Sequence, residues 1–382
     1  MPSSPVAASD GAAPLLLVDE ATAASDRILP PAWLHGLRVA TYPSGRLLAA
    51  EPAARAEAAA VLVRSMTRLG PDELAALPSL GAVATLSSGE DHLDAAALAA
   101  RGLHAASGRG GNARAVADWV QWALGCAFPD GLPADARVAV VGVGAVGGAV
   151  AADLEARGAQ VLRVDPPRAV REGGAGFVTL DAAIAARPHA LTLHVPRVRS
   201  GPHATVGLLD AARLGRLEGA ALLDAARGEL IDESAAAALR RSGRLRFLAL
   251  DVFAGEPRPD PDVVDAADLV TAHIAGHTVE GKLRVALFAV LGLWQQLERL
   301  RPDLRRPDCL RDPDRALRDA VDAALNRAGS PPPTSLRASP ALAAADRDLR
   351  ACTALGRDFL AVRAAHLRVE SSAGVDRPRP HI

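Results

Sequence analysis

The run from Arg137 to Asp165 constrains the fold more than any other stretch of this chain. It opens with the apolar residues Val138 to Val141 and continues with three glycines in the spacing GxGxxG, followed by an alanine-rich stretch at helical period. A second apolar run, Val161 to Val164, then ends at Asp165. This order of strand, tight turn, helix, strand and acid is typical of a βαβ unit that binds a dinucleotide.

The three glycines, Gly142, Gly144 and Gly147, have separate physical roles. The first permits the sharp turn, the second lets a pyrophosphate approach the backbone, and the third lets the helix pack closely on the strand. The helix N-terminus that follows offers unpaired N–H groups to the phosphates. Asp165 comes 18 residues after Gly147, where a carboxylate takes the ribose hydroxyls and repels a 2′-phosphate. We therefore predict NAD as the cofactor, with a glycine turn in some other βαβ unit as the structural alternative.

Composition limits the classes of partner and the compartment. A net charge of −1 over 382 residues gives no overall field for nucleic acid or an anionic membrane. The N-terminus lacks the basic start and apolar core of a signal peptide, and no apolar run reaches the roughly 18 residues of a membrane helix. The three cysteines are too widely spaced for a metal cluster or a disulfide framework. We expect a cytoplasmic protein without a metal, a membrane anchor or a nucleic-acid partner.

Alternating apolar runs and helical stretches predict two α/β domains, each a doubly wound parallel sheet, with a cleft between them. The expected divisions are a disordered N-terminus at 1–13, a substrate domain at 14–111 plus 285–303, an NAD-binding domain at 112–284 and a small C-terminal region at 304–382. The substrate domain has five candidate strands and the NAD-binding domain has six. Two further helices are expected at 316–328 and 341–367.

Three candidate catalytic residues follow successive strands of the second domain. Arg227 comes after the run ALLDAA, Glu256 lies in LALDVFAGEP, and His273 lies in LVTAHIAGHT. Ligands of such sheets bind at the carboxyl ends of the strands. There an arginine can grip a carboxylate, and a histidine oriented by a glutamate can accept a hydroxyl proton. Each residue alone has a structural alternative, as a surface arginine, a turn residue or a buried histidine; their joint placement favours oxidation of a 2-hydroxy acid.

These segments, together with the glycine run and TAHIAGHTVEGK, resemble the D-isomer-specific 2-hydroxyacid dehydrogenases. Four features resemble one branch of that family more narrowly: LLVDE near the start, LVRSMTRL at 62–69, DPPR at 165–168 and HIAGHTVEGK at 273–282. That branch oxidises 4-phospho-D-erythronate to 2-oxo-3-hydroxy-4-phosphobutanoate in pyridoxal phosphate biosynthesis. The resemblance covers roughly residues 15–297.

The resemblance also implies the roles of individual residues. Catalysis would rest on Arg227, Glu256 and His273, with His273 as the general base. The residues implied to contact NAD are Gly142, Gly144, Ala145, Val146, Gly147, Asp165, Val195, Ala225, Ala226, Arg227, Asp251 and Gly276. Those implied to contact the substrate are Arg64, Ser65, Ser87, Gly89 and His277. The C-terminal region would dimerise, so the resemblance implies a homodimer.

Several positions depart from the pattern of that branch. Ser87 replaces a threonine, His277 a tyrosine, Asp224 an asparagine and Gly111 a cysteine. The carboxylate of Asp224 would either pair with Arg227 or point away from it. These departures leave two alternatives open. One is a related 2-hydroxyacid dehydrogenase or 2-oxoacid reductase with another substrate, and the other is a non-catalytic NAD-sensing protein that binds a partner.

Overall fold

The computed structural model describes residues 12–23, 28–328 and 349–350. Contacts between Cα atoms divide them into two compact units. Unit 1 holds the described residues up to Asn112 together with 279–328, and unit 2 holds 113–278 together with 349–350. Most of the N-terminus expected to be disordered, most of the expected helix at 341–367 and the greater part of the expected C-terminal region lie outside the described residues.

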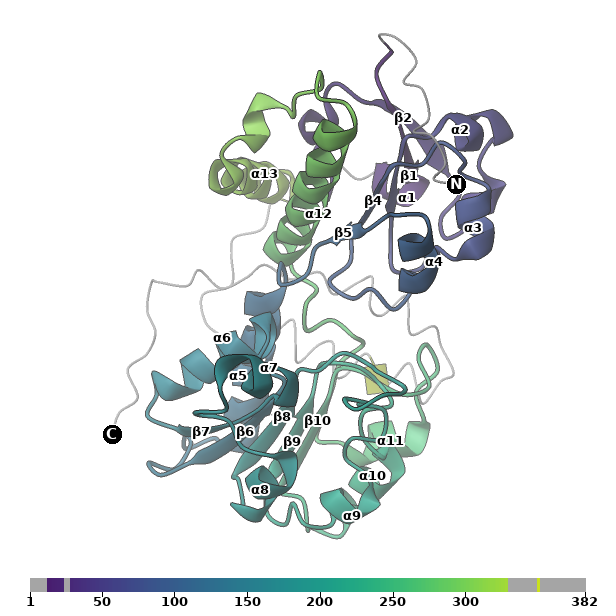
Figure 1. Cartoon of the computed structure of the whole chain (residues 1–382). Coiled ribbons are helices and arrows are strands. Elements are labelled where there is room, and N and C mark those ends of the chain that lie inside the picture. The colour runs from purple at the N-terminus through teal and green to yellow at the C-terminus, as the bar shows by residue number, and fades with distance from the viewer. Residues whose placement is uncertain (1–11, 24–27, 329–348, 351–382) are drawn as a thin grey trace. The chain divides into compact units, whose positions relative to one another are not determined.

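Unit 1 is built on a five-stranded parallel sheet in the order β2-β1-β3-β4-β5 (Figure 1). Its strands are β1 Leu15–Asp19, β2 Arg38–Tyr42, β3 Ala60–Val63, β4 Ala82–Thr85 and β5 Ala105–Ser107. Its α-helices are α1 Glu20–Ala23, α2 Pro52–Glu57, α3 Pro71–Ala75, α4 Ala95–Ala100, α12 Val279–Leu300 and α13 Pro313–Ala328, with short 3-10 helices at Pro31–Leu34, Leu47–Ala49 and Asp308–Leu310.

The two faces of this sheet carry separate cores because successive strand residues point to opposite sides. Leu16 and Val18 pack with α12 and α13 on one face, whereas Leu17 packs with residues of α3 and α4 on the other. Both faces are covered, so the inner strands β1, β3 and β4 are buried apolar runs without alternation, whereas the edge strand β2 is largely exposed. The helix expected at 316–328 is present as α13, and it packs within unit 1.

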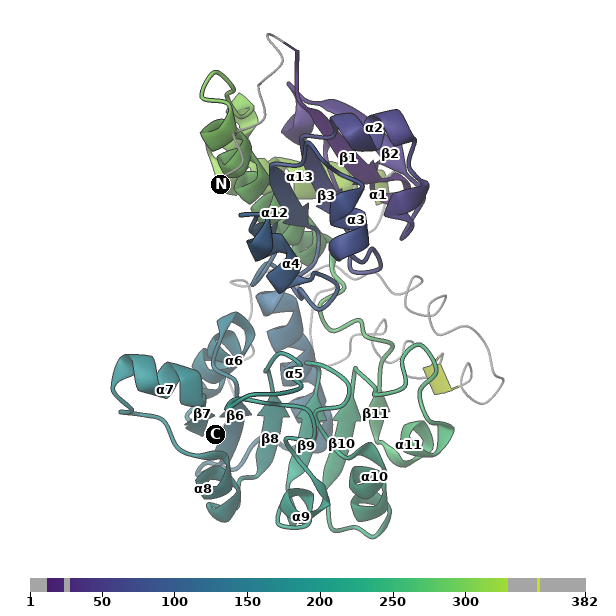
Figure 2. The ribbon, with the colours of Figure 1, turned by 45° about the vertical axis from the view of Figure 1, so that its right-hand side comes forward.

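Unit 2 is a six-stranded parallel sheet in the order β11-β10-β9-β8-β6-β7 (Figure 2). Its strands are β6 Arg137–Val141, β7 Gln160–Val164, β8 Ala190–Leu193, β9 Ala221–Asp224, β10 Phe247–Leu250 and β11 Leu269–Val270. Its helices are α5 Ala113–Ala127, α6 Ala145–Glu155, α7 Pro166–Glu172, α8 Leu180–Ala185, α9 Ala211–Leu214, α10 Glu233–Arg241 and α11 Pro261–Ala266.

The strand order of unit 2 fixes where a ligand can bind. From β6, the chain first adds the edge strand β7 on one side and then returns to add β8 on the other side of β6. The carboxyl ends of β6 and β8 therefore border a topological switch point, which is the ligand-binding position in open α/β sheets. Helices cover both faces, with α5 and α6 on one and α8 to α11 on the other. The prediction of two doubly wound parallel-sheet units is confirmed.

No helix in the described part of the chain is long and apolar enough to span a membrane. Among the same residues, no group of three or more His, Cys, Asp or Glu side chains is arranged to hold a metal ion.

Candidate active site

The glycine turn of unit 2 has the geometry that a dinucleotide requires. Gly142 has φ +85°, and a Cβ there would lie 2.6 Å from the carbonyl oxygen of His194. At Gly147 a Cβ would lie 1.9 Å from the carbonyl oxygen of Gly142, so only glycine lets α6 approach β6 this closely. A Cβ at Gly144 would meet nothing within 4 Å. Gly144 thus borders open space, whereas Gly142 and Gly147 lie directly against backbone atoms.

The N-terminus of α6 opens onto that space. Gly144 is its N-cap and carries no side-chain cap, and both Gly144 and Ala145 are exposed while Val146 is half-buried. Uncapped N–H groups at a helix N-terminus are donors for phosphate oxygens. The residues present therefore fit a pyrophosphate, on the backbone geometry alone.

Asp165 joins the two turns that follow β6 and β7. Its Oδ2 accepts the N–H of Val143 at 2.8 Å, and its Oδ1 accepts the N–H of Arg168 at 2.9 Å as the N-cap of α7. Each carboxylate oxygen has two lone pairs, so the group can still accept ribose hydroxyls. Carboxylates engage both neighbouring arginines, since Arg168 pairs with Glu172 at 2.6 Å and Arg163 pairs with Glu155. This arrangement favours a ribose without a 2′-phosphate.

Glu256 and His273, both predicted from the sequence as catalytic residues, form a hydrogen-bonded pair. Oε2 of Glu256 lies 2.8 Å from Nδ1 of His273, and Oε1 of Glu256 accepts the N–H of Phe253 at 3.0 Å. Both side chains are about a quarter to a third exposed, at 24% and 30%. Because Glu256 occupies Nδ1, Nε2 is the ring nitrogen left to exchange a proton with a ligand. The pair can therefore act as an oriented general base.

A buried carboxylate holds the backbone of His273. His273 has φ +55°, a conformation uncommon outside glycine, and its N–H donates to the carbonyl oxygen of Asp251 at 2.7 Å. The Asp251 carboxylate accepts the N–H groups of Ile274 at 2.7 Å and Ala275 at 2.9 Å, together with the Thr271 hydroxyl. Burial raises the pKa of Asp251. In this structure Asp251, expected at the cofactor, holds the turn that carries the histidine.

Arg227 lies in the turn after β9. The structure shows which partners the carboxylate of the neighbouring Asp224 has. The Asp224 carboxylate is 1% exposed and accepts the backbone N–H groups of Ala226, at 2.9 Å, and of Arg227. It therefore shapes the turn through the backbone. Burial raises the pKa of Asp224 well above its ordinary value. Arg227 is half-buried, and its Nη1 donates to the carbonyl oxygen of Ala226 at 2.7 Å.

The remaining residues expected at the cofactor or the substrate in unit 2 lie on the same strand-end loops. Val195 follows β8, and its Cγ1 would touch a Cβ placed on Gly142. Ala225 precedes the buried Ala226 in the turn after β9. Gly276 and His277 end the loop after His273, with the N–H of His277 donating to the carbonyl oxygen of Ile274 at 2.8 Å.

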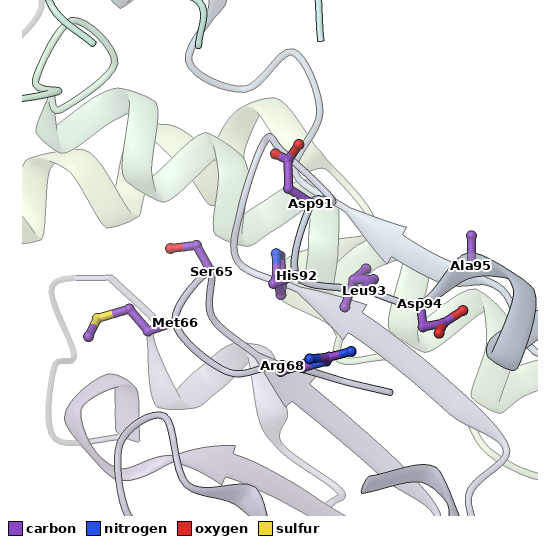
Figure 3. A pocket seen from close by; sticks show the side chains of 8 residues that line it. All are labelled: Ser65, Met66, Arg68, Asp91, His92, Leu93, Asp94 and Ala95. Carbon is purple, nitrogen blue, oxygen red and sulfur yellow. The ribbon is translucent and has the colours of Figure 1, made fainter. Parts of the chain in front are cut away.

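Unit 1 contains a pocket of about 510 Å³ at the carboxyl end of its sheet. Figure 3 shows two segments around it. One is the loop after β3 with Ser65, Met66 and Arg68, and the other runs from Asp91 to Ala95, the first residue of α4. Backbone bonds clasp the segments together, since the N–H of Leu69 donates to the carbonyl oxygen of His92 at 3.0 Å. Of the five expected substrate residues, Ser65 lines this pocket.

The other expected substrate residues of unit 1 have internal partners. Arg64 lies 3.5 Å from the buried Asp19, and the Ser87 hydroxyl accepts the N–H of Gly89 at 3.2 Å. The loop that carries Ser87 is pinned by Glu90, which accepts the Ser107 hydroxyl at 2.6 Å and pairs with Arg109 at 3.0 Å. This loop is therefore braced before any ligand arrives.

Arg68, Asp91, His92 and Asp94 line the pocket but were not predicted from the sequence as site residues. Nε2 of His92 bonds to the buried Thr85 hydroxyl at 2.9 Å, and burial lowers the pKa of His92, so its ring is neutral at physiological pH. His92 thus braces the loop and also lines the pocket. Their position in the sequence could have predicted them as pocket residues, because all four lie on the same strand-end loops as Ser65 and Ser87.

The glycine turn at a switch point and the Glu–His pair on the same sheet edge define a nucleotide-dependent dehydrogenase type of site. Residues 112–275 match the family model for the NAD binding domain of D-isomer specific 2-hydroxyacid dehydrogenases. The chain is also similar to curated erythronate-4-phosphate dehydrogenases. It is 44% identical over 236 residues to that of Salinibacter ruber and 40% identical over 254 residues to that of Aeromonas hydrophila.

The matched segments span 60% of the Salinibacter protein and 66% of the Aeromonas protein, and 60% and 65% of this chain. The predicted resemblance is confirmed over that range. Solved structures show the same fold at low identity. D-lactate dehydrogenase from Aquifex aeolicus has a TM-score of 0.56 at 19% identity, covering 74% of this chain and 97% of that one. A glyoxylate/hydroxypyruvate reductase from Sinorhizobium meliloti has a TM-score of 0.59 at 21% identity, covering 73% and 92%.

Proposed function

We propose that the chain is an NAD-dependent dehydrogenase that oxidises C2 of 4-phospho-D-erythronate to give 2-oxo-3-hydroxy-4-phosphobutanoate. The observation that carries this proposal is the 2.8 Å contact between Glu256 and Nδ1 of His273, on the same sheet edge as the glycine turn. It directs Nε2 toward a substrate proton. The relatives named erythronate-4-phosphate dehydrogenase support the choice of substrate.

The chain's residues divide the work as follows. His273 takes the proton of the C2 hydroxyl at Nε2, and Glu256 stabilises the imidazolium that forms. Arg227 holds the substrate carboxylate and fixes the orientation of C2. NAD, when bound, supplies the acceptor for the hydride that leaves C2. Gly142, Gly144, Gly147 and Asp165 hold the cofactor through backbone N–H groups and the ribose hydroxyls.

The proposed substrate contacts are Arg64, Ser65, Ser87, Gly89 and His277. A hydroxyl at Ser87 keeps the donor that a threonine would offer. Five further residues of the strand-end loops are proposed to contact the cofactor: Val195, Ala225, Ala226, Asp251 and Gly276. We further propose a cytoplasmic homodimer. Sedimentation of the full chain tests the assembly, and a monomer at micromolar concentration would contradict it.

A second candidate is a 2-hydroxyacid dehydrogenase that acts on a small acid without a phosphate. The pocket beside Ser65 favours it, because two carboxylates, Asp91 and Asp94, line that pocket with a single arginine, Arg68. This balance does not suit a phosphate dianion.

One assay separates the two candidates. The purified chain with NAD is given 4-phosphoerythronate, 3-phosphoglycerate and glycerate at equal concentrations, and NADH formation is followed. We expect the highest kcat/KM with 4-phosphoerythronate. Equal or faster turnover of glycerate would contradict the proposed substrate and favour the second candidate, whereas NAD binding without turnover of any acid would favour a sensor.

A further inference from the structure

Glu233 lies beside the catalytic pair without belonging to it. It is the first residue of α10, after the N-cap Asp232, and its Oε1 accepts the N–H of Ala254 at 2.6 Å. Ala254 is two residues before Glu256 on the segment that follows β10. That segment also carries the N–H of Phe253, which Glu256 binds. One end of the Glu256 loop is therefore tied to the N-terminus of α10 by a single carboxylate.

The loop has little room for another arrangement. A Cβ on Gly228 would lie 2.1 Å from the carbonyl oxygen of Phe253, so the turn that carries Arg227 presses against the loop that carries Glu256. The N–H of Glu256 also donates to the carbonyl oxygen of Phe253 at 3.4 Å. A shift at Ala254 would therefore move Glu256, and with it the 2.8 Å contact to His273.

Glu233 is also surrounded by acids. Glu256 and Asp260, from the segment after β10, and Asp224, from the end of β9, all interact electrostatically with it. Burial, together with the charges of Glu256 and Asp260, raises the pKa of Glu233 to about 7, although the bond from Ala254 acts in the opposite direction. The carboxyl is therefore neutral below that pH and ionised above it.

We propose that Glu233 is a positioning residue for the Glu256–His273 pair, acting through the bond to Ala254 and through its charge. This inference rests on the proposed dehydrogenase function. The bond holds the loop in place. The charge, when present, repels that of Glu256 and increases the tendency of the pair to take up the proton released by the substrate. Turnover then rises with pH for two reasons, the loss of a proton from Glu233 and the need for an unprotonated base.

Two substitutions separate these links. Glu233→Gln keeps an oxygen that can accept from Ala254 but carries no charge, and Glu233→Ala removes both. Compared with the unmodified chain, we expect Glu233→Gln to match kcat within about twofold near pH 6 and to fall about fivefold near pH 8.5. Glu233→Ala should be slower than Glu233→Gln at both pH values. Asp181→Asn, in the first turn of α8 and paired with Arg213 and Arg216, serves as a matched control that should leave the pH profile unchanged.

Superimposable pH profiles for the unmodified chain and Glu233→Gln would contradict a role for the Glu233 charge. Equal rates for the Gln and Ala variants would contradict a role for the bond to Ala254. A readout without turnover keeps the test independent of the proposed function. NMR titration of the His273 ring should give a lower midpoint in Glu233→Gln than in the unmodified chain, and an unchanged midpoint would contradict the inference. If no acid is oxidised while the midpoint still shifts, the proposed function fails and the link between Glu233 and His273 stands.

Discussion

Oδ2 of Asp165 accepts the backbone N–H of Val143 at 2.8 Å, so the acid that is expected to select the cofactor also closes the glycine turn. Asp165→Ala removes both effects. We expect the Kd for NAD to rise about tenfold, because a charge-assisted bond is lost, and we expect the preference for NAD over NADP to narrow. Fluorescence titration with both cofactors measures this. Asp181→Asn is the control. An unchanged NAD affinity of Asp165→Ala would contradict the proposed contact between Asp165 and the ribose.

The glycines Gly147 and Gly144 should respond to alanine in opposite ways. At Gly147 the added methyl meets the Gly142 carbonyl oxygen at 1.9 Å, so we expect a loss of about 3 kcal/mol in the free energy of unfolding. At Gly144 it meets nothing within 4 Å, so stability should hold while NAD affinity falls. Urea unfolding and NAD titration of both variants check this. Gly148→Ala, also in open space on α6, should affect neither.

Replacement of Arg227 should lower binding and rate together. The proposed carboxylate grip requires a planar two-pronged donor, so Arg227→Ala should reduce kcat/KM by about a hundredfold or more, and Arg227→Lys should recover only part of it. Steady-state kinetics with the preferred acid measure the effect. Arg163→Ala, which removes a surface pair with Glu155, is the matched control. A kcat/KM within twofold of the unmodified chain would exclude Arg227 from the site.

Asp224 should destabilise the fold at neutral pH. Its pKa is raised by burial above the ordinary 3.8, so the folded state binds more protons than the unfolded state as pH rises past that value, and stability is lost with increasing pH. Asp224→Asn keeps an acceptor for Ala226 without the buried charge. We expect a gain of about 1 kcal/mol near pH 8 that shrinks toward pH 4. Urea unfolding at both pH values tests this, and a variant less stable at pH 8 would contradict it.

The sequence was sufficient to predict the strand, turn and helix around the three glycines. The spacing of Gly142, Gly144 and Gly147 between two apolar runs specified strand, turn and helix, because backbone sterics allow few residues in that geometry. Arg227, Glu256 and His273 were predicted for a similar reason, since the ends of parallel strands share one edge of the sheet. These rules depend on short stretches of chain, so they can be applied to the sequence without the tertiary structure.

Only the tertiary structure decided how side chains are shared between elements. In the structure, the Asp224 carboxylate accepts a backbone N–H group, and the Asp251 carboxylate accepts N–H groups of the turn that carries His273. The Glu233 carboxylate accepts the N–H of Ala254, 21 residues away. The tertiary structure also brought Arg68 and His92 to one pocket with Ser65. A carboxylate in sequence has many possible donors, and which donor it meets depends on the packing of whole helices and strands. Local pattern cannot specify that choice, because the free energy that decides it comes from burial and from contacts between distant segments.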